Sequence, residues 1–300
     1  MTLNRQGVSS SSSDKPPALF WCDMRRLAII LILIMGLPCW AANDPTGDPN
    51  CVGWYTFEDG QSPDWLNDAS TAGNDMTNAT CSQDGTTYKE GTESLHASQY
   101  GYYVYVNDTD LSAGFPGKNS GGGNVISVVA WFRCTNLQGL DGVVNKYGTS
   151  GNRSFLFGVN NAGSGSNQYL IVSASDGASV ETVQANTGCT VGNNKWYHVG
   201  YTFDGATKKW TAVIWDDNAS TEYTDSGTFT DAVLPGVTQR LAIKAYQDGF
   251  WGGMLGNTDE VGIFDDVLTN EEITQIRSGT YGAAADTGTS NWWWRRRHND

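Results

Sequence analysis

The chain has 300 residues, with 18 basic and 32 acidic side chains and a formal net charge of −14 at pH 7. This charge excludes nucleic acid as an expected partner, because a phosphate backbone would be repelled. The 36 glycines, 12 tryptophans and 13 tyrosines, with only 17% charged residues, are typical of a turn-rich all-β protein and disfavour a helical one.

The N-terminal 42 residues are expected to lie outside the fold. The stretch "MRRLAIILILIMGLPCWAAND", residues 24–44, joins two arginines to an apolar run and ends on small residues. This is the three-part plan of a secretory signal peptide, and the apolar run is short for a membrane span. We therefore expect residues 1–42 to be an N-terminal extension with a signal peptide, and the protein to be secreted or at the cell surface. An uncleaved anchor is the alternative.

From Cys51 onward the sequence consists of short alternating or apolar runs separated by Gly, Asn and Asp. Runs of this kind, bounded by turn residues, predict β-strands. In chain order the expected strands are 51–58, 75–82, 94–98, 102–107, 124–135, 142–147, 154–160, 168–175, 180–187, 196–204, 209–217, 221–225, 240–246 and 251–265. The pair Asp204-Gly205 predicts a hairpin. The whole pattern predicts an all-β, two-sheet antiparallel jelly-roll sandwich.

One short helix is expected near the C-terminus, in "TNEEITQI". Thr269 and Glu272 have the spacing of a capping box, Ile273 and Ile276 form one apolar face, and Gly279 ends the helix. The domain is therefore assigned to residues 43–280.

Residues 281–300 are interpreted as a flexible linker that ends in "WWWRRRHND". Trp favours interfaces and Arg favours anionic groups, so this tail is a candidate for docking to an envelope surface or for self-association. A disordered end without a partner is the alternative.

Five segments occur in an order that resembles a known family. They are "VGWYTFEDG", "DASTAGNDMT", "ISVVAWFRC", "NKWYHVGYTFDG" and "DEVGIFDDVLTNEEI". Together they resemble the laminin-G-like, concanavalin A-like jelly-roll domain of secreted bacterial and viral proteins, over roughly Cys51 to Gly279. The resemblance implies a sandwich of two curved antiparallel sheets, a binding or adhesion role, and often a structural calcium ion.

Four cysteines remain after residue 42, namely Cys51, Cys81, Cys134 and Cys189. An even number in an exported protein predicts two disulfides, for which three pairings exist. The strand layout implied by the resemblance favours Cys51–Cys81 and Cys134–Cys189. A zinc site is the rival interpretation, and the absence of CxxC spacing disfavours it.

The resemblance also implies a calcium site between the first strand, the loop after it and the last strand. Calcium takes six to eight oxygen ligands, and the matching positions are Glu58, Asp59, Asp68, Asn74 and Asp259. Strand alternation places Asp259 and Glu260 on opposite faces, so only Asp259 is included. The alternative is that these acids simply face water.

No catalytic residue is expected, so the chain is predicted not to be an enzyme. Glucanases on this fold need two carboxylates about 5 Å apart on one strand, and the Glu-x-Asp-x-x-Glu pattern is missing. His198 lies in a strand and is interpreted as packed. "GSGS" at 163–166 lacks the strand and helix that a nucleophile elbow requires.

Carbohydrate binding is the favoured function, because sugars are held by flat aromatic faces with a few polar groups. We expect a glycan or cell-surface polysaccharide as the partner, with Tyr246, Asp248 and Trp251 as ligand-binding residues. A structural subunit of a surface appendage or virion is the first alternative, and a glycoside hydrolase or lyase is the second. Most other aromatics should fill the core: Trp54, Phe57, Trp131, Phe157, Trp196 and Phe203.

Overall fold

The computed structural model describes residues 45–58, 65–137, 139–161, 168–185, 187–247 and 253–282. All of them belong to one compact unit, residues 42–300. The expected signal peptide, the WWWRRRHND tail, Asp59, Asp248 and Trp251 lie outside the described residues. Within the described part of the chain, no helix combines the length and apolar character that crossing a lipid bilayer requires.

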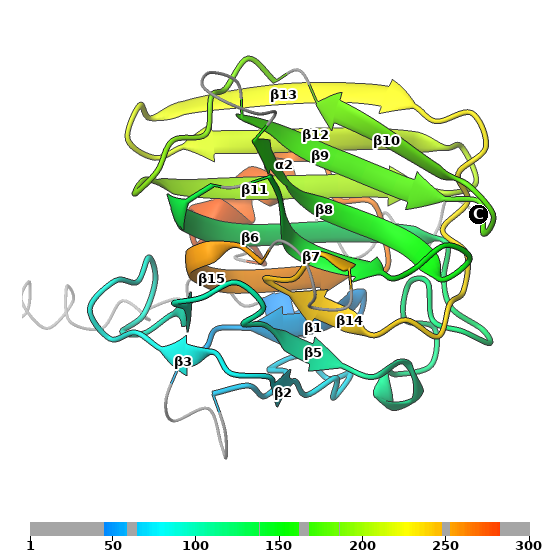
Figure 1. Ribbon diagram of the computed structural model, residues 1–300, viewed down its shortest axis with the longest axis horizontal. Coiled ribbons are helices and arrows are strands. Elements are labelled where there is room, and N and C mark those ends of the chain that lie inside the picture. Colours follow the sequence, from blue (N-terminus) through cyan, green and yellow to red (C-terminus); the bar gives the residue numbers. More distant parts are fainter. Residues whose placement is uncertain are drawn as a thin grey trace, which may run out of the picture. The chain divides into compact units, whose positions relative to one another are not determined.

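The described strands form two antiparallel sheets (Figure 1). The first contains β1 (Cys51–Tyr55), β3 (Ser82–Gln83), β4 (Leu95–Ala97), β6 (Val125–Asn136), β11 (Trp196–Asp204), β12 (Lys209–Asp216), β13 (Thr221–Thr228) and β15 (Leu255–Phe264). Its order is β13-β12-β11-β6-β15-β4-β3, with β1 also paired to β15. We refer to it as the eight-stranded sheet.

The second sheet, called the seven-stranded sheet, lies against the first. It contains β2 (Thr77–Asn78), β5 (Val104–Val106), β7 (Leu140–Tyr147), β8 (Arg153–Asn161), β9 (Gln168–Ser175), β10 (Val180–Ala185) and β14 (Leu241–Ile243). Its order is β10-β9-β8-β7-β14-β5-β2. Short 3-10 helices occupy Pro45–Gly47 and Asp108–Asp110. The predicted two-sheet jelly roll is confirmed.

The expected strand at 75–82 is instead two short strands in different sheets. Asn78 closes β2 and its side-chain oxygen accepts hydrogen bonds from the N–H groups of Thr80 and Cys81, at 2.9 and 2.8 Å. Thr80 adopts a φ of 112°, a conformation that breaks an extended run. This local turn sends the chain from the seven-stranded to the eight-stranded sheet.

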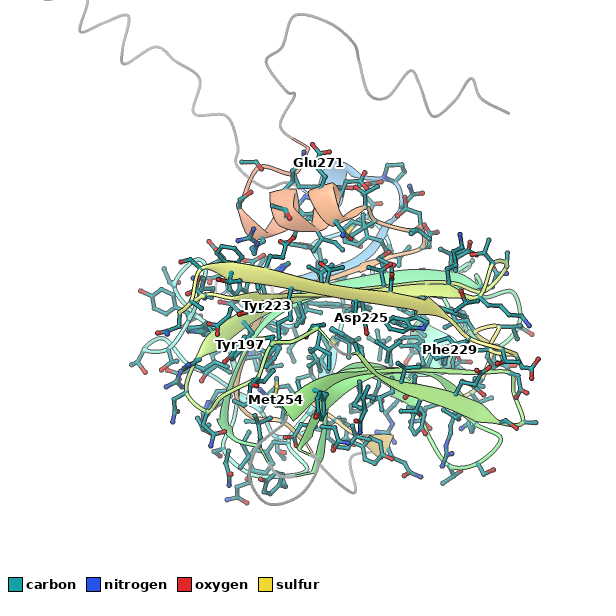
Figure 2. The ribbon with its side chains drawn as sticks, turned by 90° about the horizontal axis from the view of Figure 1, so that it is seen from above. Tyr197, Tyr223, Asp225, Phe229, Met254 and Glu271 are labelled. Carbon is teal, nitrogen blue, oxygen red and sulfur yellow. The ribbon has the colours of Figure 1, made fainter. Side chains whose placement is uncertain are left out.

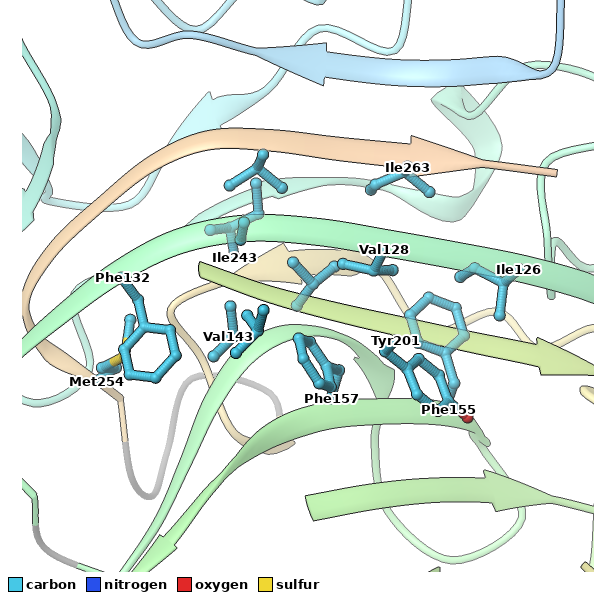
Figure 3. Packing of buried hydrophobic residues seen from close by; sticks show 14 of the residues in the cluster. Ile126, Val128, Phe132, Val143, Phe155, Phe157, Tyr201, Ile243, Met254 and Ile263 are labelled. Atoms are coloured by element: carbon cyan, nitrogen blue, oxygen red, sulfur yellow. The ribbon is translucent and has the colours of Figure 1, made fainter. Parts of the chain in front are cut away.

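The core lies between the two sheets and is rich in aromatic side chains (Figure 3). Phe157 and Tyr201 stack across it with ring centroids 5.4 Å apart. Phe57, Phe157 and Phe203 belong to this core, as predicted. Trp54 and Trp131 are buried on the outer face of the eight-stranded sheet instead, and Trp196 is only half-buried.

Helix α2 (Asn270–Arg277) covers part of that outer face, on the side away from the seven-stranded sheet (Figure 2). Thr269 and Glu272 form the predicted capping box. Ile273 packs so closely that a Cβ added at Gly200 would lie 2.7 Å from it. A second apolar cluster under the helix contains Cys51, Trp54, Val129, Val213, Phe264, Leu268, Ile273, Ile276 and Tyr281. Tyr281, assigned to the tail from the sequence, is thus packed in the domain.

Neither predicted disulfide joins the described cysteines. Cys81, Cys134 and Cys189 are buried thiols, so both expected pairings lack a bond. The sheet itself separates the first pair, because Cys51 packs in the cluster under α2 whereas Cys81 packs in the core between the sheets. Burial raises the pKa of the Cys81 and Cys189 thiols to about 11, which keeps them protonated at neutral pH.

Candidate functional site

Two of the predicted calcium ligands, Asp68 and Asn74, form a buried network beside β1. The Asp68 carboxylate accepts hydrogen bonds from the N–H groups of Trp54, Ser70 and Asn74 at 2.8–2.9 Å. The Asn74 amide donates to the carbonyl oxygen of Val52 at 2.7 Å. These bonds fix the loop after β1 against the strand.

Glu58 and Asp259 lie in a different network, around the loop between β3 and β4. Glu58 accepts hydrogen bonds from the N–H groups of Thr92 and Glu93 at 2.8 and 3.0 Å. Asp259 Oδ2 accepts from the N–H groups of Lys89 and Glu90, at 2.8 and 3.1 Å. The two carboxylates therefore hold the same loop against the eight-stranded sheet.

A β-bulge changes the expected geometry of Asp259 and Glu260. Asp259 pairs with Trp131, but the next pair in the ladder is Gly262 with Val129, and Glu260 has a φ of 47°. Two residues of β15 thus oppose one residue of β6, and strict alternation fails. The alternation used to exclude Glu260 from the site therefore does not hold here, and the charges of Asp259, Glu90 and Glu58 act on Glu260.

We call Glu58, Glu90, Asp259 and Glu260 the acid group. Its members are close enough for their negative charges to raise the pKa values of Asp259 and Glu260. Burial and the negative charge of Glu58 raise the pKa of Asp259 to about 7, against the backbone N–H groups that lower it. Burial, followed by the charges of Asp259, Glu90 and Glu58, raises the pKa of Glu260 well above its usual value. Like charges that share a partly buried site favour protons or a cation.

The structure divides the predicted calcium ligands between these two networks. Carboxylate oxygens suited to calcium gather around Asp259, but Asp68 and Asn74 already bind backbone groups of the first network. Among the described residues, no group of three or more His, Cys, Asp or Glu side chains is arranged to hold a metal ion. The residues around Asp259 supply the right kind of donor without a complete shell.

A polar and aromatic row crosses the outer face of the eight-stranded sheet from Asp259. The cross-strand neighbours along it are Asp259, Trp131, His198, Trp215 and Glu222. Lys89 lies 4.4 Å above the Trp131 ring and Arg277 lies 3.7 Å above the Trp215 ring. These are cation–π contacts, and they cover the row.

His198 in this row is packed, as expected. Burial and then the charges of Arg277 and Lys89 lower its pKa to about 3. The imidazole contacts the Trp131 ring edge-on at 5.0 Å. A buried neutral histidine between two tryptophans has no access to substrate, so it does not act as a general base.

A pocket of about 330 Å³ lies beside the turn between β9 and β10. It is lined by Asp176, Ser179, Glu181, Thr230 and Asp231. Although burial acts against it, backbone N–H groups of the 230–232 loop lower the pKa of Glu181. Hydrogen bonds from the backbone of Ser179 and Ala178 lower the pKa of Asp176. A glycosidase needs a general acid with a raised pKa, which neither carboxylate provides.

The outer face of the seven-stranded sheet has a different chemistry, and Tyr246 lies there. Its ring stacks on that of Tyr147 with centroids 5.8 Å apart and an angle of 27°. Leu156 and Ile171 complete the apolar base. Arg153 lies over the same Tyr147 ring at 4.8 Å. Tyr246 is half-buried, so part of its ring is presented to solvent.

A second group of the same composition lies beside β5 and β14: Tyr105 is in β5, while Tyr103 and Arg240 directly precede β5 and β14. The rings of Tyr103 and Tyr105 are 5.7 Å apart. The Arg240 guanidinium lies 4.7 Å from the Tyr105 ring and donates a 3.0 Å hydrogen bond to the Tyr103 hydroxyl. Sequence reasoning included Tyr246 but missed both arginines and Tyr147, because no linear spacing connects residues on separate strands.

The two-sheet antiparallel fold is that of a jelly-roll sandwich. A family model described as the concanavalin A-like lectin/glucanases superfamily matches residues 103–274. This is more than half of the chain, so the chain belongs to that superfamily. No curated protein matches the chain.

Solved structures share the fold at low sequence identity. Domain 4 of AbnA, a GH43 extracellular arabinanase from Geobacillus stearothermophilus in complex with arabinotriose, has a TM-score of 0.53 and 16% identity. The match covers 77% of this chain and 98% of that domain. At this identity the likeness establishes the fold and nothing more.

Two further similar structures are parts of larger proteins. Tailspike protein 2 of an Escherichia coli O157:H7 bacteriophage matches with a TM-score of 0.51 and 12% identity, over 69% of this chain and 27% of that one. The botulinum neurotoxin serotype G binding domain matches with a TM-score of 0.51 and 16% identity, over 76% of this chain and 50% of that one. The chain thus spans about a quarter of the tailspike and half of the toxin domain.

Proposed function

We propose that this domain is a non-catalytic carbohydrate-binding or adhesion module, and that it binds a glycan on the outer face of the seven-stranded sheet. The observation that carries the proposal is the pair of tyrosine groups on that face, Tyr246 on Tyr147 and Tyr103 with Tyr105. Sugar rings pack their C–H faces on aromatic rings, and tyrosine adds a polar hydroxyl. The AbnA domain of the same fold was solved with arabinotriose, which supports a glycan as the ligand.

The absence of catalysis is part of the proposal. The acid with a raised pKa that best resembles a general acid, Asp259, is fully buried. Its oxygens accept hydrogen bonds from the backbone N–H groups of Lys89, Glu90 and Glu260. A glycosidase acid must reach the leaving-group oxygen of its substrate, and this carboxylate faces protein instead.

Calcium and export are retained as parts of the proposed function. A cation beside Glu58 and Asp259, two of the predicted ligands, would relieve the repulsion that helps to raise the pKa values of Asp259 and Glu260. The ion would there stabilise the loop between β3 and β4, without taking part in sugar binding. An acidic, tyrosine-rich domain of this fold suits an extracellular or cell-surface location.

A second candidate is a structural subunit of a surface appendage or virion, favoured by the shared fold with a phage tailspike. It requires contacts between copies. Size-exclusion chromatography with light scattering on the full chain tests it, and a stable oligomer that binds no glycan would favour this candidate. Hydrolysis of a polysaccharide by the purified protein would favour the third, a glycosidase or lyase.

The direct test is glycan binding by variants of the tyrosine face. Tyr246→Ala and Tyr105→Ala should each weaken binding to a polysaccharide panel in affinity electrophoresis. Tyr88→Ala is the matched control, because Tyr88 is 43% exposed on the loop that contacts the eight-stranded sheet. Loss of binding in the control alone, or no binding by the wild-type protein to any glycan, would contradict the proposal.

A further inference from the structure

The two tyrosine groups on the seven-stranded sheet each contain an arginine. We define the Tyr–Arg surface as Tyr103, Tyr105, Tyr147, Tyr246, Arg153 and Arg240. In each group a guanidinium lies 4.7–4.8 Å from the nearest tyrosine ring. The pairing of a guanidinium with a tyrosine ring thus occurs twice on this sheet face.

The two groups face the same side of the sheet and lie close together. Asn145 of β7 pairs with Ala242 of β14, which pairs with Tyr105 of β5. These residues therefore form one cross-strand line, with β7 and β5 separated by two strand spacings, about 10 Å. The strand between them presents only the small Ala242 side chain. In the sheet β14 lies between β7 and β5 (Figure 1), so an extended ligand that crosses β14 would reach both groups.

The charge of both arginines is uncompensated within the described residues. The ion pairs there are Lys89–Asp217, Lys146–Asp108, Lys208–Asp231 and Arg277–Glu222. Arg153 donates through Nε to the Gly148 carbonyl oxygen, and Arg240 donates through one terminal nitrogen to Tyr103. The other guanidinium donors have no acceptor in this part of the chain, in a protein with a net charge of −14.

The surrounding sheet face is also free of competing carboxylates along its centre. The cross-strand line over all seven strands runs through Thr182, Ser173, Leu156, Asn145, Ala242, Tyr105 and Thr77. The corresponding line on the eight-stranded sheet contains Asp259 and Glu222. The central line of the face that carries the two arginines thus contains no carboxylate.

We propose that the Tyr–Arg surface selects an acidic polysaccharide, one with carboxylate or sulfate groups. The inference rests on the proposed glycan-binding function and names its ligand class. Tyrosine rings pack against the sugar rings, while Arg153 and Arg240 form charge-assisted, bidentate hydrogen bonds with the anionic groups. The stacked tyrosines hold each guanidinium in place before the ligand arrives, which lowers the entropy cost of binding.

The test compares the full-length protein with Arg153→Gln, Arg240→Gln and the double variant. The ligands are polygalacturonate as the carboxylate polymer, dextran sulfate as the sulfate polymer and dextran as the neutral one. We expect each single substitution to weaken binding to an acidic polymer about tenfold, as the loss of one charged contact implies. Binding should fall further at high salt, because the partly exposed charges are screened.

Arg133→Gln is the matched control. Arg133 is also half-buried and outside the ion pairs above, but it lies on β6 of the other sheet and donates to the Asn194 side chain at 3.2 Å. This variant should bind like the wild-type protein. Arg153→Lys and Arg240→Lys keep the charge but lose the planar fork, so they should recover only part of the affinity.

Each outcome decides a separate point. Equal, salt-independent binding of dextran and the acidic polymers, unchanged in the arginine variants, would overturn this inference and leave glycan binding intact. No binding of any polymer would overturn both. Weakening by Arg133→Gln as strong as that by Arg153→Gln would overturn it too, because it would reveal non-specific attraction. Thermal melts of every variant identify a loss of fold.

Discussion

The N–H group of Glu260 donates a 3.0 Å hydrogen bond to Oδ1 of the preceding residue, Asp259, and the negative charge of Asp259 helps to raise the pKa of Glu260. The bulge that produces this contact concentrates negative charge where the loop between β3 and β4 is attached. The proton occupancy of this site should therefore influence stability.

Stability should fall as pH rises toward neutrality. The pKa of Asp259 is about 7 in the folded protein against 3.8 for the ordinary group. Between these values the folded state binds more protons than the unfolded state, so its stabilisation is present at low pH and is lost as pH rises through about 7. Urea unfolding at about pH 5 and about pH 8 measures the difference. Asp259→Asn should flatten this dependence, and an unchanged slope in that variant would contradict the assignment.

Calcium should raise the melting temperature most at pH 8, where the acid group is ionised. We expect a shift of several degrees between calcium and chelator, since binding to the folded state alone stabilises it. Asp259→Asn should abolish the shift. Asp68→Asn should lower stability with and without calcium by the same amount, because Asp68 holds β1 and its loop through backbone hydrogen bonds. Identical wild-type melts would reject the metal.

Breaking the buried ion pair between Lys146 and Asp108 should lower the free energy of unfolding substantially. Lys146 is fully buried, contacts Asp108 at 2.7 Å and donates to the carbonyl oxygen of Val237. Lys146→Met leaves the Asp108 carboxylate buried without its partner, and should cost about 3–5 kcal/mol of unfolding free energy. Urea titration measures this loss. The double variant with Asp108→Asn should be more stable than the sum of the single losses predicts.

Cysteine reactivity should report the folded state. Cys81, Cys134 and Cys189 are buried thiols with raised pKa values, so a thiol reagent should modify them slowly in the native protein and quickly in denaturant. Mass spectrometry after alkylation counts the modified sites. Recovery of a peptide joined through Cys134 and Cys189 from native, unreduced protein would contradict the structure.

Local pattern was enough to predict the architecture. The strand ranges at 168–175 and 196–204 were predicted to the residue, because short apolar runs bounded by turn residues are typical of buried strands. The α2 capping box was equally readable, since Thr269 and Glu272 interact within one turn.

The residues of the candidate sites could be predicted from the sequence only in part, because their positions depend on contacts between distant segments. The position of Glu260 depends on a bulge that exists only when β15 pairs with β6, and a period-two pattern cannot encode an inserted residue. The placement of Trp54 and Trp131 on the outer face depends on what covers that face, namely α2 and Lys89.

The sequence by itself determined the two-sheet class, the capped helix and the acidic, aromatic composition, because each follows from interactions between near neighbours or from residue counts. Only the tertiary structure decided which carboxylates crowd together, which cysteines lie on which side of a sheet, and that Arg153 and Arg240 stand over tyrosines on one face. Those relations join residues far apart in the sequence; Arg240 and Tyr103, for example, are 137 positions apart. They arise from strand order and register rather than from any local pattern.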